Sequence, residues 1–250
     1  MLKNYFKIAI RNIIRYKTYS IINILGLSIG IAAFLMVSLY VVNEFTVDRF
    51  NENYDNIYRI EAASWFHVPA PLIPIIRQEM PDLEAVAPTE RKSVKIQYNN
   101  NYSEYLDNVI FTEADFFDIF TIDIISGIGK SALEEPYKLL LSEREAQKIF
   151  GDENAIGKQI TVDKKFTFTI AGIFRDFPDN SHLFFNALSS FQNRKIMTEQ
   201  EDFYDNWSNW NYQTYIRLSD GKNPQETLKI FNSAFNKEMA EIDPYFETFV

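Results

Sequence analysis

The stretch IINILGLSIGIAAFLMVSLYVV, residues 21–42, decides where the rest of the chain lies and how it can fold. Thirteen of its 22 positions are Ile, Leu, Phe or Val, and no charged residue occurs between Thr18 and Asn43. A membrane-spanning helix needs about 20 predominantly apolar residues. These apolar side chains contribute about −4 to −8 kcal/mol to insertion, before the polar residues and glycines are counted. The stretch therefore predicts a transmembrane helix over residues 18–45.

The charges on either side of this helix predict its orientation. Five cations and no acidic residue precede it, and the first acidic residue is Glu44. Cationic flanks stay in the cytoplasm, so we expect residues 1–17 in the cytoplasm and residues 46–250 across the membrane. A cleavable signal peptide would have an apolar region of about 7–15 residues and a small-residue cleavage site. The segment 40–45 offers no such site, which favours a retained anchor.

The segment ahead of this helix carries a cationic stripe, because Lys3, Lys7, Arg11 and Arg15 recur every four residues. Apolar side chains fall on another face of the same helix: Phe6, Ile10, Ile13 and Ile14. This pattern predicts an amphipathic helix over residues 1–17 that contacts membrane lipid. The stripe either docks a cytoplasmic partner or only sets the topology.

Small and polar residues share one face of the predicted span. Asn23, Gly26, Gly30 and Ala33 lie on that face, and Gly26 with Gly30 forms a GxxxG pattern. Such glycines let two helices approach closely, and an asparagine can hydrogen-bond across the contact. The alternative is that the glycines are incidental, since glycine is common in spanning helices. The pattern predicts a helix-packing face with partners in the membrane.

The exported part is acidic and lacks cysteine. The chain has net charge −9 and its first 17 residues carry +5, so residues 44–250 carry −14. That charge argues against nucleic acid as a partner. With no cysteine, the part can use neither disulfides nor thiolate metal sites, and its 22 Phe and 14 Tyr must supply the core.

Periodicity predicts an α+β domain over residues 46–250. Expected strands are 56–64, 92–98, 102–111, 160–162, 166–171 and 211–218. A helix is expected over residues 69–80, and another over residues 143–150 with Ser142 as N-cap and Gly151 just beyond its end. A last helix follows Asn223, and its core face consists of Leu228, Phe231, Ala234 and Phe235.

No catalytic pattern emerges from this domain. His67 and His182 lie far apart in sequence and outside any metal-ligand spacing, and no nucleophile elbow or phosphate loop occurs. Paired carboxylates are expected by chance in so acidic a chain. We therefore expect no catalytic residue, no metal and no cofactor.

Several segments nonetheless resemble one family. They are LLSEREAQKIFGDENAIGK (140–158), IAGIFRDFPDNSH (170–182), FFDIF (116–120) with Gly127 and Leu133, and FKIAIRN (6–12) with ILGLSIG (24–30). Together they resemble the first membrane helix and periplasmic core domain of MacB/FtsX-like ABC transporter permeases. The resemblance implies a domain of two lobes with mixed sheets and flanking helices. It assigns structural roles to Ser142, Phe150, Gly151, Gly157, Gly172 and Pro178.

What the resemblance implies for function is transport by mechanotransmission in the cytoplasmic (inner) membrane. A separate cytoplasmic ATPase would supply energy, a second permease subunit would complete a dimer, and a periplasmic or outer-membrane partner would receive the cargo. The cargo class would be lipoproteins, peptides or drugs. Family members have further membrane helices after this domain, so we expect either a truncated permease or a single-pass relative. The alternative function is a membrane-anchored extracytoplasmic binding or sensor module.

Overall fold

The structure is a computed structural model that describes residues 2–61, 66–80, 82–99, 102–178, 181–199 and 206–242. The chain forms two compact units, residues 1–47 and residues 48–250. We call the first the helical unit and the second the domain. The end of the expected strand 56–64 and the apex of the turn at 100–101 lie outside the described residues.

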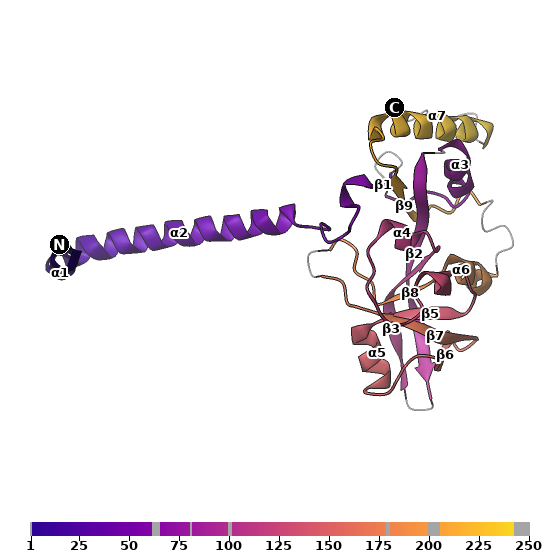
Figure 1. The fold of residues 1–250 in the computed structure, drawn as a ribbon, viewed down its shortest axis with the longest axis horizontal. Coiled ribbons are helices and arrows are strands. Elements are labelled where there is room, and N and C mark those ends of the chain that lie inside the picture. Colours follow the sequence, from indigo (N-terminus) through magenta and orange to yellow (C-terminus); the bar gives the residue numbers. More distant parts are fainter. Residues whose placement is uncertain are drawn as a thin grey trace. The chain divides into compact units, whose positions relative to one another are not determined.

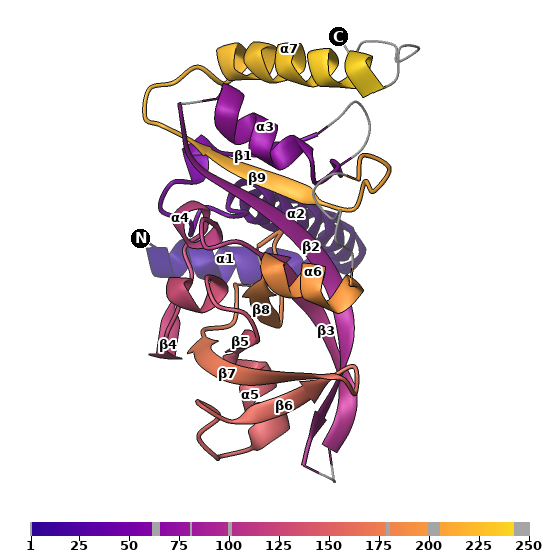
Figure 2. The same cartoon turned by 90° about the vertical axis from the view of Figure 1, so that its right-hand side faces the viewer.

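The helical unit contains α1 (Leu2–Arg15) and α2 (Lys17–Phe45). Tyr16, with φ −113° and ψ 55°, breaks the helical path between them, so α1 turns across the end of α2 rather than extending it (Figures 1 and 2). The 29 residues of α2 span about 43 Å at about 1.5 Å per residue. By length and composition α2 is able to cross a membrane.

The domain is built on one mixed nine-stranded sheet (Figure 2). Its strands are β1 (Ile57–Ile60), β2 (Leu83–Tyr98), β3 (Tyr102–Thr112), β4 (Ile124–Gly127), β5 (Lys138–Ser142), β6 (Gln159–Val162), β7 (Phe166–Phe174), β8 (Ala187–Ser190) and β9 (Gln213–Leu218). Their order is β1-β9-β2-β3-β8-β5-β7-β4, and β6 pairs with β2 and β7. The pairs β3–β8 and β5–β7 are parallel and the others antiparallel, which confirms the α+β class.

The long strand β2 joins the two ends of the domain. Its first half pairs with β9 and its second half with β3 and β6, so the strands form one continuous hydrogen-bonded path. At one end α3 (Leu72–Glu79) and α7 (Pro224–Ile242) pack together. The opposite end carries α5 (Glu143–Phe150) beside the β6–β7 hairpin (Figure 2).

Both faces of the sheet are buried, by two separate cores. Along β5, Leu139 and Leu141 enter the first core and Leu140 the second, because successive side chains of a strand point to opposite faces. The first core also takes side chains from α3, α5, α7 and α6 (Phe191–Thr198). The second takes side chains from α4 (Phe116–Ile119) and the short helix η2 (Lys130–Leu133). A further short helix, η1 (Tyr54–Asn56), precedes β1.

One predicted core residue is exposed. Phe231 and Phe235 of α7 are buried as expected, but Leu228 is 48% exposed. The physical reason is that the first turns of α7 border a cavity, so the periodic pattern continues past the end of the packed surface.

Candidate functional site

The predicted packing face of α2 is uncovered in this structure. Asn23, Gly26, Gly30 and Ala33 are exposed, and a Cβ added at either glycine would meet no described atom within 4 Å. None of the α2 residues, all of them described, is buried. An apolar helix of this kind is stable only when lipid or other helices surround it. The face therefore remains open to a partner helix.

The predicted cationic stripe lies on α1. Lys7, Arg11 and Arg15 are exposed there, whereas the Lys3 side chain falls outside the described part of the chain. The apolar face is equally exposed, with Phe6 at 71% and Ile14 at 61%. An amphipathic helix that exposes both faces fits a position between lipid and water.

The motif residues around α5 fix the start and end of a helix. Ser142 is the N-cap, its Oγ accepting a hydrogen bond from the Glu145 N–H at 3.3 Å. The Ser142 N–H donates to the carbonyl of Asn186 (2.8 Å), the residue just before β8. This hydrogen bond connects the start of α5 to β8. Gly151 closes the helix with φ 62°, a value that favours glycine. Buried Phe150 packs edge-on against another ring of the first core.

Gly157 and Gly172 are glycine for different reasons. Gly157 has φ 81° and donates its N–H to the Ile170 carbonyl at 2.9 Å, with open space where a Cβ would stand. At Gly172, in β7, a Cβ would overlap the backbone carbonyl of Ile128 and press on Leu140. The Pro178 carbonyl accepts a hydrogen bond from the Ser181 N–H at 3.0 Å. The structure does not bring these motif residues into one site.

Asp48 is the first residue of the domain, and both oxygens of its carboxylate bond to Ser181 and His182. One oxygen of the Asp48 carboxylate accepts hydrogen bonds from Ser181 Oγ (3.1 Å) and the His182 N–H (3.0 Å). The other oxygen pairs with Nδ1 of the His182 ring. Asp48 has φ 59°, a left-handed conformation that aspartate tolerates better than most side chains.

Asn51 also bonds to Asp48, through the backbone carbonyl of that residue. Its backbone N–H and its Nδ2 both donate to the Asp48 carbonyl at 3.1 Å. Its Oδ1 accepts from the Thr121 N–H at 3.0 Å, and Asn51 as a whole is only 3% exposed. We call Asp48, Asn51, Thr121, Ser181 and His182 the Asp48 junction.

The His182 ring contacts two aromatic residues of the second core, Phe120 and Tyr215. Its centroid lies 6.4 Å from that of Phe120 and 5.9 Å from that of Tyr215, and Nε2 is 3.4 Å from the Tyr215 hydroxyl. Burial raises the pKa of the Tyr215 hydroxyl. The two ring nitrogens of His182 face Asp48 on one side and Tyr215 on the other, and one chain of polar contacts links the three residues.

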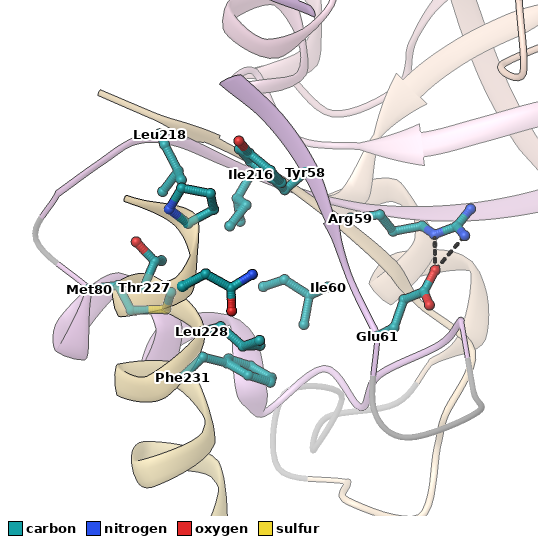
Figure 3. Close-up of a pocket in the computed structure, with 12 residues that line it drawn as sticks. Tyr58, Arg59, Ile60, Glu61, Met80, Ile216, Leu218, Thr227, Leu228 and Phe231 are labelled. Carbon is teal, nitrogen blue, oxygen red and sulfur yellow. Dashed lines mark hydrogen bonds and ion pairs between the residues drawn. The ribbon is translucent and has the colours of Figure 1, made fainter. Parts of the chain in front are cut away.

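A cavity of about 250 Å³ lies between β1, β9 and the first turns of α7 (Figure 3). Ile60, Ile216, Leu218 and Phe231 line it, and Figure 3 places the Arg59–Glu61 ion pair at one side. Its lining is mainly apolar and brings no nucleophile and base together. Among the described residues there is also no group of three His, Asp or Glu side chains that could hold a metal.

Sequence reasoning missed the Asp48 junction. Ser181 and His182 belong to a motif, but Asp48 and Asn51 stand in a polar segment with no periodic pattern. The one signal was local: Asp and Asn favour turns and left-handed backbone. Nothing in the sequence indicated that their partners lie 70 and about 134 residues further along the chain.

Comparison with known proteins identifies the architecture. Residues 20–233 match the model of the MacB-like periplasmic core domain. A domain assigned to a permease protein of Porphyromonas gingivalis superposes with a TM-score of 0.63 at 25% identity, covering 76% of this chain and 85% of that one. No sequence among curated proteins matches the chain.

Two more distant structures share the fold. The periplasmic region of MacB from Actinobacillus actinomycetemcomitans has a TM-score of 0.54 at 14% identity, covering 73% of this chain and 82% of that one. The extracellular domain of the noncanonic ABC-type transporter YknZ from Gram-positive bacteria has a TM-score of 0.55 at 12% identity, covering 74% of this chain and 93% of that one.

Proposed function

The chain belongs to the family of the MacB-like periplasmic core domain, a domain of ABC transporter permeases, and from this premise we propose that it is a mechanotransmission permease. In this function ATP is hydrolysed in a separate cytoplasmic subunit. The membrane helices convey the resulting movement to the domain. The observation that carries the proposal is the family domain joined to an uncovered apolar helix of membrane length.

The proposed partners follow from the surfaces of the helical unit. The stripe of Lys7, Arg11 and Arg15 lies on the side that the positive-inside rule assigns to the cytoplasm, where the ATPase would dock. The exposed Gly26 and Gly30 face would pack against membrane helices of this or a second permease subunit. The domain would then lie outside the inner membrane and act on lipoproteins, peptides or drugs.

A binding or sensor module remains the second candidate, and the cavity beneath α7 favours it. That cavity is apolar and of a size that suits one large side chain or a short alkyl chain. Such a module would bind its ligand without an ATPase.

Capture of an ATPase separates the two functions. The full chain, tagged and extracted from native membranes, should retain an ABC ATPase. A variant that exchanges Lys7 with Tyr5 and Arg11 with Ala9 keeps the net charge, and hence the topology, but moves two cations to the opposite side of the helix. It should lose the ATPase while inserting in the same orientation. Failure of the native sequence to retain any ATPase would contradict the transporter and favour the binding module.

A further inference from the structure

We infer that the Asp48 junction is the mechanical link through which movement of α2 reaches the domain, with Asp48 and His182 as the residues that carry the force. The inference rests on the proposed function, because a domain that is moved from the membrane needs a firm attachment. Only Thr46 and Val47 separate Phe45, the end of α2, from Asp48. Val47 N–H donates to the Glu44 carbonyl (3.4 Å) just beyond the end of α2.

The attachment is a carboxylate with three hydrogen-bonding partners, and its side chain is only 24% exposed. Asp48 is held by a hydroxyl, a backbone amide and an imidazole, all from the pair Ser181–His182. Hydrogen bonds to an ionised acceptor are shorter and stronger than those between neutral groups. The left-handed backbone at Asp48 is retained because these contacts and the Asn51 hydrogen bonds hold it.

The loop that holds Asp48 is itself anchored. Leu183 N–H donates to Ser181 Oγ at 3.1 Å, and the side chains of Leu183 and Phe185 are buried in the second core, at 3% and 2% exposure. Displacing His182 would therefore expose the buried side chains that follow it, in addition to deforming the loop backbone.

Two routes lead from the junction into the sheet and meet there. Through His182 the first reaches Tyr215 in β9, a strand that pairs with both β1 and β2. The second runs through Asn51 and Thr121 to the adjacent Phe120, whose ring packs edge-on against Tyr215 at 5.1 Å. Load applied at Asp48 is thus shared among three hydrogen-bonded strands.

The test measures how closely the domain follows the helix. Because the chain has no cysteine, spin labels at Glu44→Cys and Glu134→Cys report one distance distribution in the full chain held in a lipid nanodisc. The native sequence should give a narrow distribution. Asp48→Ala and His182→Ala should each lose the narrow component, and the double variant should lose no more than either single one. Asp55→Ala and His67→Ala are matched controls and should keep it.

The readout distinguishes a link from a merely stabilising contact. Asp48→Asn keeps one acceptor oxygen and should recover part of the narrow component, while thermal unfolding shows that each variant is folded. A broad distribution in the native sequence, or a narrow one in folded Asp48→Ala, overturns the link. The measurement needs no ATPase, so the link can fail while ATPase capture succeeds, and the reverse.

Discussion

The carboxylate of Glu90 in β2 lies 2.6 Å from Nε of Arg194 in α6, and the Glu90 side chain is 3% exposed. This ion pair joins α6 to β2. Lys92 is a second partner at 2.9 Å, but its own side chain is 39% exposed. The pair is therefore the main compensation for a charge that has left water.

Removing the Arg194 cation should destabilise the domain. In Arg194→Met the Glu90 carboxylate stays buried with one exposed partner, and we expect a loss of about 3 kcal/mol in the free energy of unfolding. Urea unfolding followed by tryptophan fluorescence measures it. Arg144→Met, which breaks an exposed pair with Asp176, is the matched control and should change little. An equally small effect at Arg194 would mean that water reaches Glu90.

The two motif glycines should respond differently to alanine. Gly172→Ala forces a Cβ against the Ile128 carbonyl and Leu140, so we expect about 3 kcal/mol of destabilisation and weaker β4–β7 pairing. In Gly157→Ala the added Cβ meets open space, so only the left-handed backbone is unfavourable. We expect this variant to lose about 1–2 kcal/mol in the free energy of unfolding. Denaturation midpoints of both variants test the order. Equal costs would show that the backbone around Gly172 relaxes.

Glu145 should make stability depend on pH. Burial raises the pKa of its carboxyl, Glu104 and Asp107 act in the same direction, and Lys148 opposes them. Because the folded pKa lies above the unfolded one, this carboxyl's stabilising contribution is fully present below the unfolded pKa. It is lost as the pH rises through the folded pKa.

Glu145→Gln keeps the shape of the side chain and removes the charge. It should be more stable than the native sequence at neutral pH, with the difference shrinking on acidification through that window. Urea midpoints at several pH values between about 4 and 8 measure this. Glu143→Gln, at an exposed position of the same helix, is the matched control. A destabilised Glu145→Gln at neutral pH would mean that Lys148 outweighs burial.

The packing face of α2 can be tested by added bulk. Gly30→Leu fills the GxxxG face, whereas Ala32→Leu adds bulk on a different side of the same helix. If the face packs against another membrane helix, Gly30→Leu should reduce association in mild detergent and Ala32→Leu should not. Cross-linking of the full chain measures the associated fraction. Equal association of both variants would assign the glycines no packing role.

Much of the local structure follows from short-range chemistry that the sequence displays. The N-cap at Ser142, the glycine after Phe150, and the Asn223 cap, whose Oδ1 accepts from the Gln225 N–H at 3.0 Å, depend on neighbouring residues alone. The apolar run of α2 is equally local. These features were predictable because each satisfies backbone groups a few residues away.

Features that depend on distant partners were not predictable. Strand β8 has only four residues, and it forms because β3 and β5 lie on either side of it. Leu228 fits the helical pattern yet stands exposed beside a cavity, since periodicity cannot tell where the packed surface ends. Strand β2 begins at Leu83, well before the expected start at residue 92, because β9 extends its pairing.

Short-range patterns in the sequence were enough to predict an apolar helix long enough to cross a membrane, a cationic segment ahead of it, and an acidic, cysteine-free α+β domain. Charge, hydropathy and capping act over a few residues and can be read directly. The contact of Asp48 with His182 and that of Glu90 with Arg194 became known only from the folded chain. Such contacts between residues more than 100 positions apart exist because the sheet order brings their strands and loops together, and no local pattern encodes that order.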